Sequence, residues 1–220
     1  VKDGDTITTS GCVASGMPEA LTKALEQRYL ETGSPKNLTL YYAAAQGNRD
    51  GSGADHFAHE GMLKRVIGGH YNMVPALGKL ITDNKLEAYN LPQGTLSQLY
   101  RDIAAHKLGT LTHVGMNTFA DPRIEGGKLN DVTTEDIVEV VEVLGEERLL
   151  YKAQKFDIGF IRGSYADENG NVTLEHECCT TEATSIAQAV KNCGGKVVVQ
   201  VEKVVQDGCV DPKLVKIPGI

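Results

Sequence analysis

The segment TSGCVASGMPEALTKAL, residues 9–25, places a loop of small residues between Gly11 and Gly16 and follows it with apolar residues at the spacing of one helix face. Isoleucine and threonine before it favour a strand, so the unit predicts a β-strand, a glycine loop and an α-helix. Glycines let backbone N–H groups approach a ligand closely. A phosphate-binding P-loop is excluded, because Met17 and Pro18 follow the second glycine in place of lysine and serine or threonine.

The composition narrows the function classes. The chain has 220 residues, of which 41% are hydrophobic, which is enough for one large core or two smaller ones. The net charge of −7, with no run of lysine or arginine, argues against nucleic acid as a partner. No apolar run approaches the roughly 18 residues of a membrane span, and the polar start lacks the features of a signal peptide. We therefore expect a cytoplasmic protein without a membrane partner.

The five cysteines form no CxxC pair, and two of them are adjacent. An odd number in this arrangement suits free thiols in a reducing compartment better than a disulfide framework. Cys12 lies in the glycine loop, where it is either a nucleophile or a small buried side chain; we favour the second.

Strands are predicted where β-branched and aromatic residues cluster, at residues 6–11, 38–45, 65–69, 86–90, 111–118, 156–166, 171–175 and 196–205. Helices are predicted where apolar residues recur three and four positions apart, at 18–31, 55–64, 74–83, 95–106 and 182–193. This alternation predicts an α/β fold with a mostly parallel sheet and flanking helices. Residues 147–180 contain strands without helices between them, which predicts an added antiparallel hairpin region.

The string DGDTITTSGCVASGMP, residues 3–18, resembles the N-terminal signature of the family I coenzyme A transferases. The matching positions are Asp3, Gly4, Gly11, Gly16 and Pro18. The sequence departs from that signature at Thr8, Thr9, Ser10 and Cys12, where the family has apolar residues, a glycine and an aromatic residue. These changes leave a smaller loop, so they bear on the shape of the substrate.

Three further segments resemble the same family in the expected order: LPQGTLSQLYRDI (91–103), DIGFIRGSYADENGNVTLE (157–175) and the closing stretch 197–220. The resemblance is greatest to fused, single-chain acetate and propionate CoA-transferases, and it implies that residues 1–220 are the N-terminal, alpha-type domain. The chain begins with Val1 and stops at VKIPGI, so both ends look cut. The C-terminal domain with the catalytic glutamate is therefore expected outside this chain.

The resemblance implies a ping-pong exchange of CoA between a short-chain acyl-CoA, of the acetyl or propionyl type, and a free carboxylate. A glutamate on the other half would carry the CoA as a thioester. Coenzyme A is then a substrate, and no permanently bound cofactor is expected. The implied partners are a C-terminal domain or a beta subunit, in a complete enzyme that is a homo-oligomer.

The resemblance also nominates site residues. The glycine loop would bind the small carboxylate through Gly11, Cys12, Val13, Ala14, Ser15 and Gly16. Gln93, in the Pro-Gln-Gly motif, would donate a hydrogen bond to the reacting oxygen without adding charge, although it could instead cap the following helix. Gln46 and Gly47 end a predicted strand, where ligands collect in parallel sheets, but QGNRDG is also an ordinary polar turn.

Two other strings invite a functional reading that we reject. Glu168-Asn169-Gly170 spells the motif of the family's nucleophile, but Asn-Gly between strands is a strong hairpin signal that would place Glu168 in water. His56, His59 and Glu60 have helical spacing, yet no further residue completes a metal site, so we expect no metal.

Two alternatives to an enzyme stay open at this point. One is a sugar-phosphate-binding sensor domain of similar fold, and the other is a structural fragment without activity. A phosphate-binding loop would favour a basic residue close to the glycines. Residues 9–22 contain none, and Lys23 falls inside the predicted helix.

Overall fold

The computed structural model, which describes residues 1–219, is built on a six-stranded sheet in which all neighbouring strands are parallel. The strand order is β11 (Lys196–Gln200), β8 (Ile158–Arg162), β1 (Thr6–Thr9), β2 (Leu38–Tyr41), β3 (Leu63–Gly68) and β4 (Glu87–Asn90). β1 therefore lies in the interior of the sheet. Because the strands run in the same direction, the loops that follow them emerge at one edge, the carboxyl edge.

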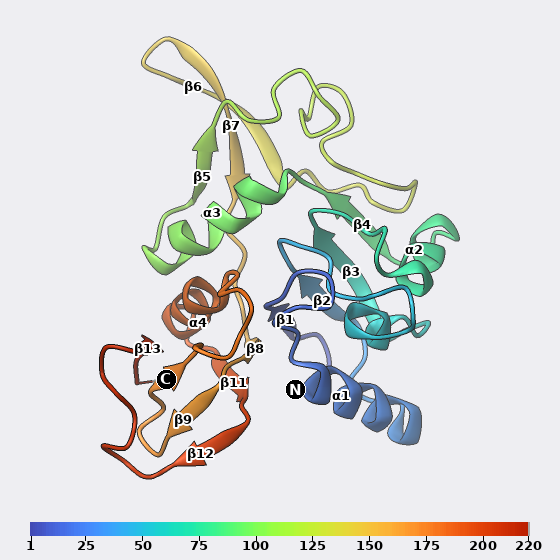
Figure 1. Ribbon diagram of the computed structural model, residues 1–220. Coiled ribbons are helices and arrows are strands. Elements are labelled where there is room, and N and C mark those ends of the chain that lie inside the picture. The colour runs from blue at the N-terminus through green and yellow to red at the C-terminus, as the bar shows by residue number, and fades with distance from the viewer. Residues whose placement is uncertain (220) are drawn as a thin grey trace.

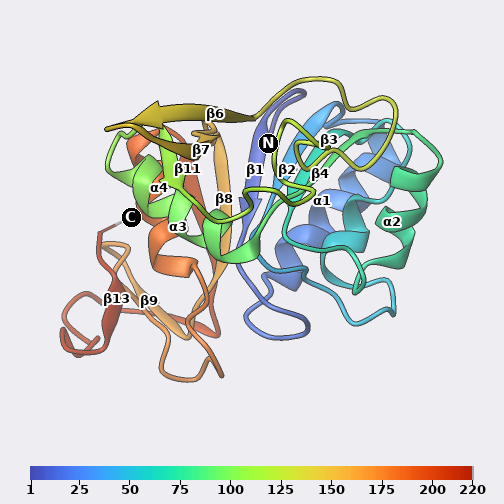
Figure 2. The ribbon, with the colours of Figure 1, turned by 90° about the horizontal axis from the view of Figure 1, so that it is seen from above.

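Helices cover both faces of this sheet, which confirms the predicted α/β fold. In Figure 1 and Figure 2, α1 (Glu19–Thr32) and α2 (Pro75–Thr82) lie on one face, and α3 (Gln93–Ala104) and α4 (Ala183–Asn192) on the other. The four corresponding predicted helices are confirmed, with ends shifted by one or two residues. Each pair of helices packs over its own apolar core. No helix within residues 1–219 is long and apolar enough to span a membrane.

Two smaller sheets extend the fold, one beyond α3 and the other near the C-terminus (Figure 1). The first is antiparallel and consists of β5 (Gly109–Thr112), β7 (Glu146–Lys152) and β6 (Val138–Val143), in that order. The second has the order β12 (Lys203–Val205), β9 (Tyr165–Asp167), β10 (Val172–Thr173) and β13 (Val215–Ile217). β9 and β10 pair antiparallel, which confirms the predicted hairpin.

The predicted antiparallel arrangement of residues 147–180 is wrong for β8, which joins the main parallel sheet between β1 and β11. Residues 156–166, predicted as one strand, are β8 and β9 in different sheets. The chain changes partners at Gly163, whose N–H donates to Gln200 of β11, and Ser164, whose N–H donates to Thr173 of β10. Residues 196–205 are likewise divided between β11 and β12.

Two other predicted elements are wrong in part. The predicted helix 55–64 is a short 3-10 helix, η1 (Gly53–Phe57), because the chain turns at Gly61, with a φ of 88°, to enter β3. The predicted strand 111–118 ends at Thr112, and residues after it form turns. β6 and β7 were not predicted, since their exposed glutamates dilute the apolar pattern.

Candidate functional site at the carboxyl edge of the sheet

The glycine loop leaves the end of β1 as a compact turn closed by its own backbone. The N–H of Cys12 donates to the carbonyl of Ser15 at 2.9 Å, and the N–H of Ser15 donates to the carbonyl of Cys12 at 3.0 Å. Ser10, which stands where the family signature has a glycine, donates its hydroxyl to the carbonyl of Gly16 at 3.3 Å. The departure at Ser10 is therefore accommodated inside the loop, while Val13 and Ala14 are exposed at its tip.

This loop is held against the segment that follows β2. The N–H of Val13 donates to the Ala45 carbonyl at 2.9 Å, and the N–H of Gly47 donates to the Val13 carbonyl at 3.0 Å. The Gln46 side chain is buried, and its Nε2 donates to the carbonyl of Thr9 at 2.9 Å. The parallel pairing of β1 with β2 thus continues past both strand ends, as the bridge between Val13 and Gln46 shows.

The geometry separates the roles of the two glutamines that the sequence nominated. The Gln46 side chain is buried, and its amide nitrogen holds the segment after β2 against Thr9, the last residue of β1. Contact of Gln46 and Gly47 with a ligand stays a prediction. Gln93 is exposed as the first residue of α3, and within residues 1–219 its amide makes no hydrogen bond. The helix-capping alternative for Gln93 is therefore not supported, and its amide is available to a ligand.

Gln93 lies at the same edge as the glycine loop through a chain of contacts across the ends of β2, β3 and β4. A Cβ built on Gly69 would lie 2.9 Å from the Cβ of Gln93, so the two residues are in direct contact. Asn90 donates its Nδ2 to the Gly69 carbonyl at 3.0 Å, and the N–H of Gly69 donates to the Ala43 carbonyl at 3.1 Å. Ala43 and Gln46 belong to the same segment after β2, which is the segment that contacts the glycine loop.

Two groups near this edge were missed in the sequence. His70 accepts a hydrogen bond from the N–H of Ala45 at its Nε2, at 3.3 Å. Arg49, two residues beyond Gly47, donates through its guanidinium to both oxygens of Asn72. The sequence offers only their position as a sign that they lie near the site, because both residues follow a predicted strand by a few residues.

A segment distant in sequence also contacts the glycine loop. Cys178 and Cys179 are exposed free thiols with their sulfurs 3.9 Å apart. Hydrogen bonds with the Ser15 hydroxyl and with Cys179 lower the pKa of the Cys178 thiol. Cys12 is half-buried rather than fully buried. Thiols therefore lie beside the loop, although nothing in the sequence pattern relates position 178 to position 15.

The two rejected strings have clear places in the fold. Glu168 is exposed in the turn between β9 and β10, where the N–H of Gly170 donates to the Asp167 carbonyl at 3.1 Å. His56 and His59 contact carboxylates of α1, and Glu60 pairs with Lys85 at 2.9 Å. Within residues 1–219 no three His, Cys, Asp or Glu side chains are grouped as metal ligands.

A pocket on the four-stranded sheet, lined by Tyr165 and Lys203 among others, shares no residue with the glycine loop.

The family model described as "Coenzyme A transferase" matches residues 1–220. The chain belongs to the coenzyme A transferase family. Among relatives of this CoA-transferase chain, caffeate CoA-transferase of Acetobacterium woodii is 43% identical over 219 residues. Acetate CoA-transferase YdiF of Escherichia coli K12 is 42% identical over 221 residues. Both matches cover 100% of this chain, but only 42% and 41% of the relatives.

A solved structure of the E. coli O157:H7 acyl-CoA transferase YdiF, in a thioester complex with CoA, superposes with a TM-score of 0.97 at 40% identity. It is covered over 43% of its length, and this chain over 100%. The CoA-transferase chain therefore spans about two-fifths of the fused proteins that it matches. The acetoacetyl-CoA:acetate/butyrate CoA transferase alpha subunit of Clostridium acetobutylicum is 30% identical over 170 residues, which are 68% of that subunit.

The contact between the glycine loop and Gln46 should not tolerate a side chain at Gly11. This residue has a φ of 129°, and a Cβ on it would lie 3.0 Å from the Gln46 Cγ. Gly11→Ala should therefore weaken the pairing of Val13 with Ala45 and destabilise the protein by about 1–3 kcal/mol. Hydrogen exchange should show faster exchange in the peptides that contain Val13 and Gly47.

The matched control is Gly78→Ala in α2, where a Cβ would meet no atom within 4 Å. This change should be neutral or stabilising, because alanine is the better helix former by about 1 kcal/mol. Unchanged exchange at the glycine loop in Gly11→Ala would contradict the fastening role of this contact.

Proposed function

We propose that residues 1–220 are the N-terminal half of a CoA-transferase that exchanges CoA between a short-chain acyl-CoA and a free carboxylate. A glutamate on the other half attacks the thioester carbonyl, which forms an acyl-glutamyl anhydride and releases the CoA thiolate. The thiolate then attacks the glutamyl carbonyl, giving a glutamyl-CoA thioester and the first free carboxylate. An incoming carboxylate runs the two steps in reverse and leaves with the CoA.

The observation that carries this proposal is that the glycine loop and the unbonded Gln93 amide both lie at the carboxyl edge of the sheet, connected through Gly69 and the segment after β2. Each attack on a carbonyl passes through a tetrahedral intermediate with negative charge on its oxygen, and an uncharged amide N–H stabilises that oxygen without trapping the carboxylate product. The N-terminus of α1, directly after the loop, adds a favourable partial charge for an anion. The protein's own contribution is thus to bind and orient the carboxyl group of the substrate.

Three further observations support placing the catalytic glutamate on another half of the enzyme, outside residues 1–220. Glu168 is exposed at a hairpin tip, and an activated carboxylate needs an oriented environment shielded from water. The matched fused relatives are more than twice as long as this chain. Exposed apolar side chains around the three-stranded sheet, among them Leu108, Ile124 and Leu144, offer surface that a C-terminal domain or beta subunit would cover.

The acyl group is governed, in this proposal, by the tip of the glycine loop. Cys12, Val13 and Ala14 are smaller than the aromatic residue with which the family signature begins the loop, so they leave room for a larger acyl chain than acetate. No observation favours the sugar-phosphate sensor, since the loop carries no basic residue and the Arg49 guanidinium is bonded to Asn72.

The proposal is tested by assaying the complete enzyme, as one chain or with its second subunit, with acetyl-CoA and propionate. We expect propionyl-CoA and acetate in equal amounts. Incubation with acetyl-CoA followed by borohydride should reduce the glutamyl-CoA thioester, and peptide mapping should find the reduced glutamate outside residues 1–220. Reduction at Glu168 would contradict the assignment, and absence of any transfer would overturn the proposed activity.

Gln93→Ala in the complete enzyme should lower kcat by roughly 100-fold, the usual scale for one donor to a developing oxyanion. The exposed side chain makes no hydrogen bond within residues 1–219, so stability should change little. Gln98→Ala is a control on the same helix, because this exposed glutamine donates a hydrogen bond to Asp102 of its own helix at 3.4 Å. Wild-type turnover in folded Gln93→Ala would remove Gln93 from the site.

A further inference from the structure

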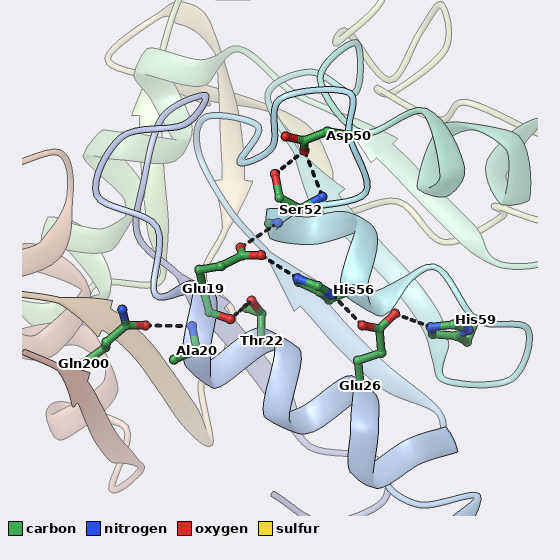
Figure 3. A network of polar contacts seen from close by, with 10 residues as sticks. Glu19, Ala20, Thr22, Glu26, Asp50, Ser52, His56, His59 and Gln200 are labelled. Atoms are coloured by element: carbon green, nitrogen blue, oxygen red, sulfur yellow. Dashed lines mark hydrogen bonds and ion pairs between the residues drawn. The ribbon is translucent and has the colours of Figure 1, made fainter. Parts of the chain in front are cut away.

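A charged network joins α1, which begins three residues after the glycine loop, to η1, and it involves both histidines that the sequence analysis considered for metal binding (Figure 3). His56 Nε2 is 2.6 Å from Glu19 Oε1, and His56 Nδ1 is 2.6 Å from Glu26 Oε2. The second oxygen of Glu26 is 2.7 Å from His59 Nε2. Glu19 and Glu26 lie two turns apart on α1, so His56 bridges two points of one helix.

The two contacts fix the charge of His56. An ionised carboxylate only accepts hydrogen bonds, so both ring nitrogens must carry a proton, and His56 is an imidazolium. Burial alone would lower the pKa of His56, but hydrogen bonds to Glu19 and Glu26 outweigh it and raise the pKa above 6.5. Burial alone would raise the pKa of Glu26, and the two histidines more than offset this effect.

The network connects α1 to the segment that fastens the glycine loop. The remaining oxygen of Glu19, Oε2, accepts the N–H of Gly53 at 2.9 Å. The next N–H, from Ala54, donates to the Gln46 carbonyl at 2.8 Å. Glu19 is also the first residue of α1, only three positions after Gly16. Both ends of the glycine loop are therefore tied to the short helix η1 that carries His56.

We propose that His56 is a positioning residue: as an imidazolium bound by Glu19 and Glu26, it holds the start of α1 and the glycine loop against the Gln46 segment. The proposal rests on the proposed function, because the loop is the part of the site that binds the carboxyl group. The consequence is a site whose loop geometry depends on one proton.

The pH window follows from the two groups. A histidine with a raised pKa stabilises the fold fully below its unfolded value, near 6.5, and the contribution is lost as the pH rises through the higher folded value. Glu26, with a lowered pKa, contributes above about 4.5 and loses its contribution as the pH falls through the folded value. The loop should therefore loosen on the alkaline side as His56 loses its second proton.

Other charged groups around His56 do not replace these contacts. Its neighbour Asp55 points to α2 and accepts the N–H of Leu77 at 3.0 Å. The lysine of α2, Lys79, pairs with Asp83 at 2.6 Å. His59 pairs with the other oxygen of Glu26, at 2.7 Å, and not with Glu19.

Two substitutions distinguish the effect of the second proton on His56 from the effect of the contacts that its side chain makes. Glu19→Gln keeps both contacts with a neutral His56, because the new amide donates to His56 Nε2 while its oxygen still accepts the Gly53 N–H. His56→Ala removes the bridge: Glu19 loses its histidine partner, and Glu26 keeps only its contact with His59 among the two histidines. His59→Ala is the matched control, since it removes a histidine from Glu26 but leaves His56 in place.

The complete enzyme and its variants should be compared by hydrogen exchange of the Gly53 amide, corrected for the intrinsic rate, and by kcat and KM between pH 6 and 9 in the CoA-transfer assay. For His56→Ala we expect about ten-fold less protection of Gly53, since hydrogen bonds to charged groups are lost. We also expect kcat to fall about ten-fold or more through misplacement of the loop. His59→Ala should match wild type in both measurements.

Wild type should lose Gly53 protection and kcat together as the pH rises, and Glu19→Gln should show neither loss. Equal Gly53 protection in His56→Ala and wild type, or the same alkaline decline in Glu19→Gln as in wild type, would overturn the proposal. If wild type transfers no CoA, the proposed function fails, whereas the exchange measurement still decides the role of His56.

Discussion

The glycine loop continues the pairing of β1 with β2 beyond the ends of both strands, and the rest of the carboxyl edge depends on this contact. Val13 takes the place of a strand residue opposite Gln46, and Gly11 allows the Gln46 side chain to pass beneath the loop. Since the sheet is parallel, the loops after β3 and β4 emerge beside it. The position of Gln93 relative to the glycine loop is therefore set by the main sheet and not by either loop alone.

Some polar side chains at this edge bond within the protein and hold its loops in place, whereas Gln93 is left exposed and can bind a ligand. Buried polar side chains need partners, and Gln46 finds one in the Thr9 carbonyl. Gln93 is exposed and unbonded within residues 1–219, which is the state expected of a group that contacts a ligand. A group of charged side chains, Glu19, His56 and Glu26, pairs internally between α1 and η1. The proposed exchange of one carboxylate for another suits an uncharged binding surface, because a fixed cation would retain the product.

Much of this arrangement could be predicted from the sequence. The loop, its flanking strand and helix, and the mostly parallel character of the sheet follow from local patterns and from the resemblance of residues 3–18 to a family signature. The partner exchange at Gly163 and Ser164 could not be predicted, since it depends on β10 and β11, which are distant in sequence. The helix predicted at 55–64 failed because His56 and Phe57 are buried by tertiary contacts of a short 3-10 helix, and burial of that kind imitates helical spacing.

The contacts around the site were less predictable than the fold. His56 and His59 have a spacing that suggests ligands on one helix, whereas their actual partners are carboxylates more than twenty-five residues earlier in the chain. Ser15 and Cys178 are a further example, because the interaction that lowers the pKa of the Cys178 thiol joins two loops unrelated in sequence. Local periodicity identifies which elements exist, but side-chain partners across the sheet edge require the three-dimensional structure.

The most direct test of the account is a crystal structure of the complete enzyme trapped as its glutamyl-CoA thioester. We expect the thioester carbonyl oxygen to lie about 3 Å from the Gln93 amide nitrogen, with the glycine loop forming the adjoining wall. A thioester bound at the pocket on the four-stranded sheet, beside Tyr165 and Lys203, would contradict the placement of the site at the carboxyl edge.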